Sequence, residues 1–181
     1  MNQATDTHDT RQSMPTAGGV ERAHTPEHLR AVLGHYPSGV TVVTATNNGV
    51  PTGFACQSFH ALSLDPPLAV LLVGKGSTSW PNIKAADFFA VNVLSETQGE
   101  LCRAFAKSGA DKFAGVQWTS SRLGAPILQN ISAWFECQVA AEHDGGDHLI
   151  VVARILDLGE SDDIAPLIFH RGLFRTISAT A

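Results

Sequence analysis

The chain has 181 residues, of which 44% are hydrophobic and 16% are charged, and its formal net charge at pH 7 is −5. That length is sufficient for one domain with its own hydrophobic core, and the composition is typical of a folded globular protein. The negative charge and the lack of any run of Lys and Arg argue against a surface that binds nucleic acid or an anionic membrane. We therefore expect a single domain with no nucleic-acid partner and no membrane partner.

The placement of cysteine and histidine argues against disulfides and metals. Cys56, Cys102 and Cys137 are widely spaced and odd in number, which predicts no disulfide framework and fits a reducing cytoplasm. The segment HDGGDH, residues 143–148, gathers two His and two Asp, which are residue types that bind metals. Its central glycines are typical of a tight hairpin turn with solvated carboxylates. We therefore expect a cytoplasmic protein without a metal site.

The first residues of the chain differ from the rest. Residues 1–24 lack the basic start and the apolar core of a secretory signal, and we predict that they form a disordered tail. The longest apolar runs, residues 68–73 and 149–153, are much shorter than the roughly 18 to 20 residues that cross a bilayer. The predicted ordered domain spans residues 25–178.

Turn signals and apolar patterns predict strands in the first half of the domain. A Thr-Pro pair favours the start of a helix over residues 26–34. β-Branched residues predict a strand over 39–46, and the Asn-Asn-Gly that follows predicts a hairpin to a second strand over 50–58. The run 67–74 is almost entirely apolar, which predicts a strand buried on both faces.

The second half of the domain continues this pattern. It predicts a helix over 78–86, a strand over 88–94, a helix over 97–107, a hairpin of strands 132–143 and 148–159, and a last strand over 166–177. Six or seven strands with two or three short helices do not alternate regularly enough for a doubly wound sheet. The predicted fold is mainly β, an antiparallel barrel with helices at its edge.

The segment GFACQSFHALSLDPP, residues 53–67, carries small and hydroxyl residues where a strand core is normally apolar. Gly53 and Ala55 would let a planar ligand approach the main chain, while Cys56 to Ser58 would offer polar partners to its edge. The same residues are equally consistent with a strand that has no ligand and ends in a turn stiffened by proline. Composition leaves both interpretations open.

Other motifs are weaker. Ser58 and Ser63 are candidate nucleophiles, but the Gly-x-Ser-x-Gly elbow of a hydrolase is absent. The segment GKGST, residues 74–78, offers an anion its backbone N–H groups, a lysine and two hydroxyls, and is equally well a surface turn. His148 begins an apolar strand, where it can contact a ligand or face water.

Seven segments, in order, resemble the flavin reductase family with the FMN-binding split-barrel fold: HYPSGVTVVTA, PTGFACQSFHALSLDPPLAVLLV, STSWPNI, FFAVNVL, DKFAG, GAPIL and GGDHLIVVARI. The resemblance covers about residues 28–175 and is closest to the reductase components of secosteroid and 4-hydroxyphenylacetate hydroxylases. It implies a homodimeric antiparallel split β-barrel that uses NADH or NADPH to reduce FMN or FAD. The reduced flavin would diffuse to a partner monooxygenase that hydroxylates an aromatic or steroid-derived phenolic substrate.

The resemblance also assigns site residues. It implies a catalytic role for His148, in a motif on the nicotinamide side of the flavin, and a phosphate contact for Lys112. The implied cofactor-binding residues are Phe54, Ala55, Cys56, Gln57, Ser58, Ser63, Leu64, Asp65, Ser77, Thr78, Ser79, Phe105, Lys112, Phe113, Asp147, His148 and Arg171. Cys56 and Gln57 depart from the residues that many relatives carry there, which affects the hydrogen bonds expected at the flavin ring.

Two other classes of function fit the same fold. A barrel that binds flavin without reducing it, for storage or sensing, would show no oxidation of NADH or NADPH. An oxidase of the pyridoxamine-phosphate type needs a substrate-phosphate site rich in arginine, whereas this chain has 12 Lys and Arg in total. The first alternative therefore remains the stronger one.

Overall fold

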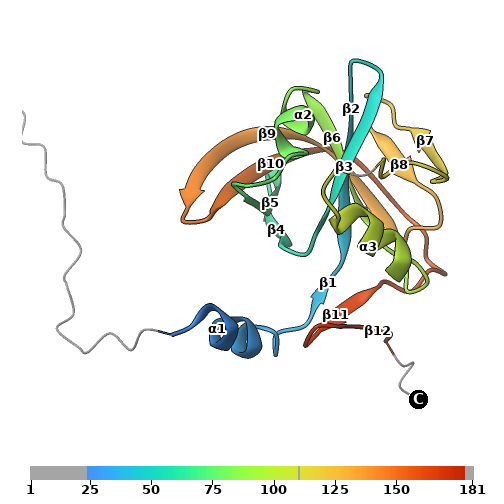
Figure 1. The fold of residues 1–181 in the computed structure, drawn as a ribbon. Helices are drawn as coiled ribbons and strands as arrows, with labels where there is room; N and C mark the ends of the chain where they lie inside the picture. The colour runs from blue at the N-terminus through green and yellow to red at the C-terminus, as the bar shows by residue number, and fades with distance from the viewer. Residues whose placement is uncertain (1–23, 110, 178–181) are drawn as a thin grey trace, which may run out of the picture.

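The computed structural model describes residues 24–109 and 111–177 of the chain. Strands dominate this part of the protein, and the helices are short (Figure 1). The elements are α1 Pro26–Leu33, β1 Ser38–Gly39, β2 Thr41–Asn47, β3 Val50–Cys56, β4 Phe59–Leu64, β5 Pro67–Gly74, α2 Trp80–Lys84, β6 Phe88–Val93, α3 Gly99–Ala106, β7 Trp118–Ser120, β8 Pro126–Leu128, β9 Ala133–Gly145, β10 His148–Glu160, β11 Ile168–His170 and β12 Leu173–Arg175.

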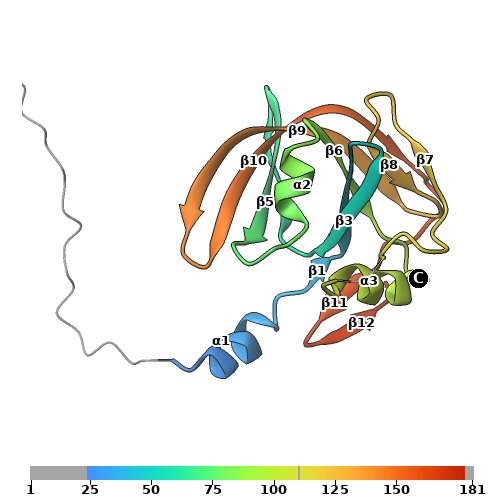
Figure 2. The ribbon, with the colours of Figure 1, turned by 45° about the horizontal axis from the view of Figure 1, so that its top comes forward.

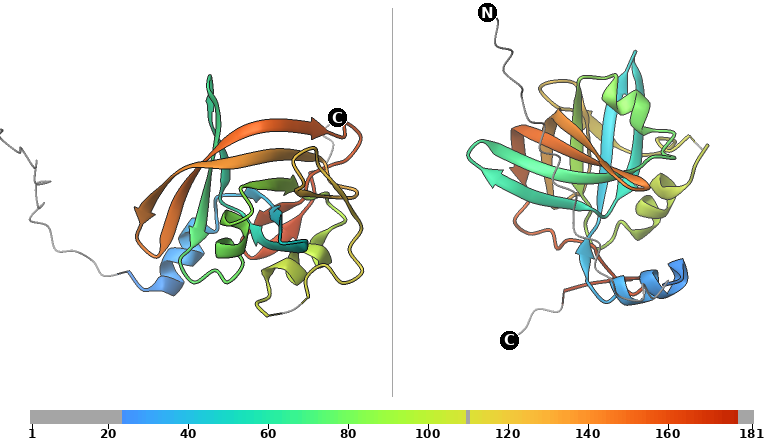
Figure 3. Two further views of the ribbon diagram at one scale, coloured as in Figure 1. Left: turned by 90° about the horizontal axis from the view of Figure 1, so that it is seen from above. Right: turned by 90° about the vertical axis from the view of Figure 1, so that its left-hand side faces the viewer.

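A seven-stranded antiparallel sheet forms the body of the domain, with the strand order β3-β2-β6-β9-β10-β5-β4. The first and last strands of this order, β3 and β4, are consecutive in the sequence and separated only by Gln57 and Ser58. The sheet therefore curls until its two edges approach each other, as the views in Figure 2 and Figure 3 show. The main chains of β3 and β4 do not pair, so the barrel is split along this line.

Alternating burial along the strands builds the core inside the curled sheet. Val43, Leu71, Phe89, Val91 and Val151 come from four different strands, are at most 1% exposed, and belong to one apolar cluster. Side chains of a strand point alternately to its two faces, so every second residue reaches this core. Burial of these side chains supplies most of the driving force for closing the sheet.

The outer face of β2 and β6 is also buried, and it carries two polar side chains, Thr44 and Asn92, beside apolar ones such as Val42. The Thr44 hydroxyl donates to the carbonyl of Pro126 at 2.6 Å, and the Asn92 side-chain oxygen accepts from the N–H of Leu128 at 2.9 Å. The Asn92 amide group also donates to the Thr44 hydroxyl at 2.9 Å. These bonds attach the β7–β8 hairpin to the outside of the barrel and satisfy buried groups that would otherwise be costly.

Helix α1 lies outside the barrel, beside a small sheet of β1, β11 and β12 (Figure 1; Figure 3, right). The N–H of His28 donates to the Thr25 hydroxyl at 3.2 Å, which confirms the predicted helix start. None of its residues is buried. Leu29 is 45% exposed and Val32 is 57% exposed, so this chain alone does not cover the apolar side of α1.

The sequence correctly predicted the antiparallel barrel, the β2–β3 hairpin, the β9–β10 hairpin and both later helices. It was wrong about β5, whose Leu72 is 40% exposed, because β5 buries one face and presents the other to the split. The predicted last strand is instead two short strands around a turn at Arg171 and Gly172. Twelve strands occur in the described residues. One of them, β4, lies between the strand predicted over 50–58 and the proline turn, where no separate strand was predicted.

Two other expectations concern the ends of the chain and the membrane. Residues 1–23 and 178–181 lie outside the described residues, so the tail and the exact domain boundaries stay predictions. Among the helices of the described part, none is long and apolar enough to cross a membrane.

Candidate functional site

Beside the unpaired edge of β3, residues of β3 and β5 line a cavity of about 330 Å³, which we call the β3 cavity. It lies where the edge of β3 has no neighbouring strand, so main-chain donors and acceptors of that edge are available to a ligand. Its lining residues are Phe54, Ala55, Cys56, Gln57, Ser58, Leu72, Gly74, Ser77, Cys102, Ala106 and His148. Seven of these are predicted cofactor-binding residues from three distant segments of the sequence.

A second cavity of about 270 Å³ adjoins the other half of β3, and we call it the Lys112 cavity. Thr78 and Ser79 contribute hydroxyl groups to it, and Lys112 contributes an ammonium group. Its lining residues are Val50, Pro51, Thr52, Gly53, Thr78, Ser79, Gly109, Asp111, Lys112 and Phe113. The two cavities thus follow one another along β3. The Lys112 cavity borders the N-terminal half of the strand, and the β3 cavity borders its C-terminal half.

Lys112 joins three segments around this cavity. Its Nζ donates to the carbonyl oxygens of Gly53 and Phe105, both at 3.0 Å, and lies 3.4 Å from the Ser79 hydroxyl. Burial lowers the pKa of the Lys112 ammonium, and these oxygen atoms offset part of that cost. The carboxylate of Asp111, its neighbour, accepts from the N–H of Phe113 at 3.1 Å. Lys112 is therefore held by neutral oxygens, which leaves its positive charge for an anionic ligand.

Gly53 is required by the packing of α3 on β3. A Cβ atom at Gly53 would lie 2.8 Å from Phe105 Cε1 and 2.8 Å from the carbonyl oxygen of Val43. Neither contact is tolerated without a shift of backbone or ring. Phe105 is fully buried in the cluster between α3 and the sheet, so it supports β3 from below and does not line either cavity.

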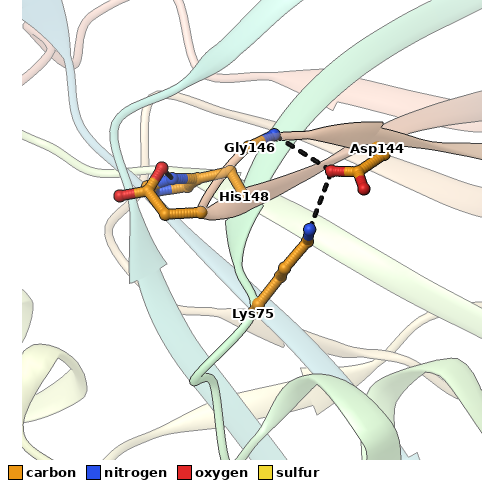
Figure 4. Close-up of polar contacts among 5 residues, drawn as sticks. Lys75, Asp144, Gly146 and His148 are labelled. Carbon is orange, nitrogen blue, oxygen red and sulfur yellow. Dashed lines mark hydrogen bonds and ion pairs between the residues drawn. The ribbon is translucent and has the colours of Figure 1, made fainter.

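His148 lines the β3 cavity from the start of β10. Figure 4 shows its side chain beside the hairpin tip. Its Nδ1 lies 2.7 Å from Asp147 Oδ1, and its Nε2 is 3.8 Å from the place where a Cβ of Gly74 would be. The hydrogen bond and charge of His148 lower the pKa of the Asp147 carboxyl. Asp147 therefore orients the imidazole by one ring nitrogen and leaves Nε2 on the side of Gly74.

An ion pair fixes the hairpin tip that carries His148. Lys75 Nζ donates to Asp144 Oδ1 at 2.7 Å, and the same oxygen accepts from the N–H of Gly146 at 3.0 Å (Figure 4). The main-chain N–H of Lys75 donates to the carbonyl of Asp147 at 3.0 Å. The Asp144 carboxylate thus bonds to a lysine and a backbone N–H, and the Asp147 carboxylate bonds to a histidine. These contacts are expected for an ordered hairpin turn.

Helix α2 positions the hydroxyl residues between the two cavities. The N–H of Trp80 donates to the Ser77 hydroxyl at 3.2 Å, and its indole Nε1 donates to Glu142 Oε1 on β9 at 3.0 Å. Lys84 also bonds to Glu142, which lowers the pKa of this carboxyl. Trp80 is 5% exposed and belongs to the core, so α2 is anchored at both ends. Figure 2 shows α2 between β5 and β3.

Cys56 contributes to the β3 cavity but is not a reactive thiol. Its residue is 5% exposed and belongs to the core cluster, and burial raises the pKa of the thiol to about 11. A thiol with that pKa is almost fully protonated at neutral pH. Cys56 therefore contributes main-chain groups and the bulk of its side chain to the cavity wall.

Some predicted residues fall outside both cavities. Ser63, Leu64 and Asp65 lie at the end of β4 and beyond it, and Leu64 is 93% exposed. Arg171 lines a separate cavity beside α1. Asp147 acts through His148 and is not a lining residue. Their assignment as cofactor-binding residues stays a prediction.

Sequence reasoning missed other lining residues of the site. Leu72 lies in a segment predicted only as a buried strand, and Cys102 and Ala106 lie in one predicted only as a helix. Only the curl of the sheet brings β5 and α3 to the edge of β3, and no local pattern encodes that approach. Gly74 was noted as part of a possible anion loop, and here it lies beside the His148 ring.

The fold and the cavities define a class of protein. A split antiparallel barrel exposes a strand edge to a ligand, and hydroxyl groups and one lysine adjoin that edge. A planar ligand that carries a phosphate fits such a site, because its ring can lie against the main chain while the anion meets Lys112. These are the properties of a flavin-binding barrel.

Comparison with known proteins identifies the family. Residues 33–178 match the model of the flavin reductase like domain. The chain is 46% identical over 152 residues to the reductase subunit HsaB of a flavin-dependent monooxygenase from Rhodococcus jostii, an alignment that covers 84% of this chain and 78% of that protein. The chain belongs to the flavin reductase family.

Solved structures agree with this assignment. Nitrilotriacetate monooxygenase component B from Mycobacterium thermoresistibile superposes with a TM-score of 0.81 at 44% identity, covering 84% of this chain and 86% of that one. The NADH:FAD oxidoreductase SgcE6 from Streptomyces globisporus, in complex with NAD and FAD fragments, gives a TM-score of 0.81 at 34% identity and covers 86% and 94%. The predicted split-barrel fold is confirmed.

Proposed function

We propose that this protein transfers a hydride from NADH or NADPH to FMN or FAD and releases the reduced flavin to a flavin-dependent monooxygenase. The observation that carries the proposal is the unpaired edge of β3, flanked by Lys112 at one end and by His148 at the other. Relatives support it: one is named a reductase subunit of a flavin-dependent monooxygenase, and another an FMN reductase that uses NADH.

The residues of the site fit a flavin. The β3 cavity is of the size that small ligands occupy and has main-chain groups on one wall. Lys112, Thr78 and Ser79 provide a cation and two hydroxyls for the flavin phosphate. When bound, the flavin supplies the redox chemistry by accepting the hydride of the nicotinamide.

The protein's own residues place the reactants. Main-chain groups from Phe54 to Ser58 would hold the polar edge of the flavin ring, and Phe105 packs against β3 on the side of α3. His148, oriented by Asp147, borders the space left for the nicotinamide at the mouth of the cavity. Hydride transfer needs no acid or base, so the catalytic contribution of His148 in this proposal is to position the nicotinamide.

The proposal is tested by following the oxidation of NADH and NADPH at 340 nm with purified protein, with and without added FMN or FAD. We expect oxidation that depends on added flavin. Comparison of the rates then shows whether NADH or NADPH, and whether FMN or FAD, is preferred. If flavin binds and neither nicotinamide is oxidised, the protein is a flavin-binding module without reductase activity. A fixed flavin that stays with the protein during purification would instead favour an oxidase.

His148→Ala should raise the KM for the nicotinamide and lower kcat, because the wall beside Gly74 is lost while the flavin contacts of β3 remain. Flavin affinity, measured by fluorescence quenching, should not change. His143→Ala, an exposed histidine on the same hairpin, is the matched control. Unchanged kinetics of His148→Ala with both NADH and NADPH would refute this role.

Lys112→Ala should weaken FMN binding by roughly tenfold, because a charge-assisted bond to the phosphate is lost. Riboflavin has no phosphate, and its binding should change little. Lys107→Ala is the control, since Lys107 is exposed at the end of α3. Equal losses for FMN and riboflavin would mean that Lys112 acts only by holding Gly53 and Phe105 together.

We also propose that the protein is a homodimer that uses α1. Leu29 and Val32 lie one helical turn apart on α1, and both are exposed. The double variant Leu29→Asp, Val32→Asp should therefore be monomeric in light scattering after gel filtration, while Leu158→Asp, an exposed apolar site on β10, should leave the mass unchanged. A wild-type protein that is monomeric at micromolar concentration would contradict the proposal.

The partner monooxygenase receives its flavin by diffusion in this proposal, which fits a shallow site that holds its cofactor by an open edge. The aromatic or steroid-derived phenolic substrate of that partner stays a prediction from the resemblance. Cytoplasmic localisation, inferred from the three widely spaced cysteines, likewise stays a prediction.

A further inference from the structure

Glu136 is a fully buried carboxylate that takes no part in the site described above. It lies in β9 between Phe135 and Cys137, which both pack in the apolar cluster inside the barrel, so its own side chain points to the outer face of the sheet. Its Oε1 accepts from the Ser121 hydroxyl and, at 3.1 Å, from the N–H of Leu123. Its Oε2 is buried and has no hydrogen-bond partner among the residues that the structure describes.

A carboxylate in this position is costly for the fold. Burial removes its hydration, and an apolar side chain of similar volume in the place of a buried charge is often neutral or stabilising. The unsatisfied oxygen adds to that cost. Glu136 therefore provides something that an apolar residue would not. Its two hydrogen bonds show what that is, namely a fixed position for residues 121–123.

These residues form the turn of the β7–β8 hairpin, and Glu136 holds the β7 side of it. Thr44 and Asn92 hold only the β8 side, as described above. The Ser121 hydroxyl that donates to Glu136 also accepts from the N–H of Ala125 at 2.8 Å, so one carboxylate fixes both sides of the turn.

A second polar contact of the turn with the sheet is weaker. Within the described part of the chain, the only other such contact of residues 121–125 is the ion pair of Arg122 with Asp157, at 3.7 Å. Both of these side chains are exposed, at 65% and 41%, and exposed ion pairs contribute little. Glu136 is therefore the main polar anchor of this turn.

A short packed segment, residues 113–117, joins the hairpin to Lys112. The Phe113 ring packs edge-on against Trp118, the first residue of β7, with the ring centroids 6.2 Å apart. It also packs against Phe105 of α3, at 5.1 Å. Lys112 thus lies between α3 on one side and β7 on the other, so its position depends on where the hairpin is anchored.

We propose that Glu136 is a positioning residue for Lys112: through the turn at residues 121–123 and the β7–β8 hairpin, it sets where the ammonium group meets the flavin phosphate. The inference rests on the proposed reductase function, in which Lys112 contacts that phosphate. It gives the buried carboxylate a role in flavin affinity although Glu136 lines neither cavity of the site.

Binding of FMN and of riboflavin, measured by fluorescence quenching, tests this role. Glu136→Leu should weaken FMN binding by roughly fivefold and leave riboflavin binding unchanged, because only FMN has the phosphate that Lys112 meets. Glu136→Gln keeps an oxygen that accepts from Ser121 and Leu123, so its FMN affinity should stay within about twofold of the wild type. Arg122→Gln removes the exposed ion pair of the same turn and should behave as wild type.

Equal losses for FMN and riboflavin in Glu136→Leu would show that the residue only stabilises the fold, and would overturn the proposal. If Glu136→Leu does not fold, Ser121→Ala replaces it, because this variant removes one of the two bonds and leaves the carboxylate in place.

A double-mutant cycle shows whether Glu136 acts through Lys112. In the Lys112→Ala background, Glu136→Leu should cause no further loss of FMN affinity. A loss that adds in full to that of Lys112→Ala would contradict the proposal. A Lys112→Ala variant with unaltered FMN affinity would overturn the phosphate contact and this proposal together, and the reductase function would then still be decided by the oxidation of NADH and NADPH.

The position of Lys112 can also be followed without flavin. Burial lowers the pKa of the Lys112 ammonium, so the NMR resonance of its dimethylated amine should titrate at lower pH than that of an exposed lysine. In Glu136→Leu the amine becomes less buried, and its pKa should rise toward the ordinary value of a lysine. An unchanged titration would refute the positioning role. A protein that meets these expectations and oxidises no nicotinamide would support this inference while the reductase proposal fails.

Discussion

The unpaired edge of β3 is the constraint on which the rest of the site depends. In the seven-stranded sheet, β3 and β4 are consecutive strands at opposite edges, and only Gln57 and Ser58 connect them. So short a connection forces the sheet to curl, yet the main chains of the two strands do not pair. An edge inside a fold is normally a liability for aggregation. Here the edge of β3 borders the β3 cavity, so a ligand in the cavity can bond to the unpaired main-chain groups of β3.

Holding that edge open requires contacts from outside the sheet. Lys112 bonds to the carbonyls of Gly53 and Phe105, and the lack of a side chain at Gly53 lets the Phe105 ring reach the strand. On the outer face, Thr44 and Asn92 attach the β7–β8 hairpin, which follows Lys112 in the chain. The group that meets a flavin phosphate in our proposal is thus also a part of the scaffold, which couples flavin binding to the position of α3.

Local sequence signals predicted much of this fold and part of the site. The Asn-Asn-Gly turn, the Gly-Gly turn at residues 145–146 and the Thr25 cap each act within a few residues, so their effects could be read directly. The β11–β12 turn could not, because Arg171 has no intrinsic preference for a positive φ and depends on Gly34 for its hydrogen bond. Likewise β5 was predicted to be buried on both faces, since its apolar letters do not reveal that one face borders the split.

The sequence alone determined the class of fold, through turn residues and apolar patterns that act over short distances, and its seven ordered motifs indicated the family. It also singled out Phe54 to Ser58, Lys112 and His148 as candidate ligand contacts. Tertiary structure decided which of these residues meet, because the curl of the sheet brings β3, β5, α3 and the start of β10 to one cavity. It also placed Arg30 beside Arg171, since only packing between distant segments can bring two such charges together.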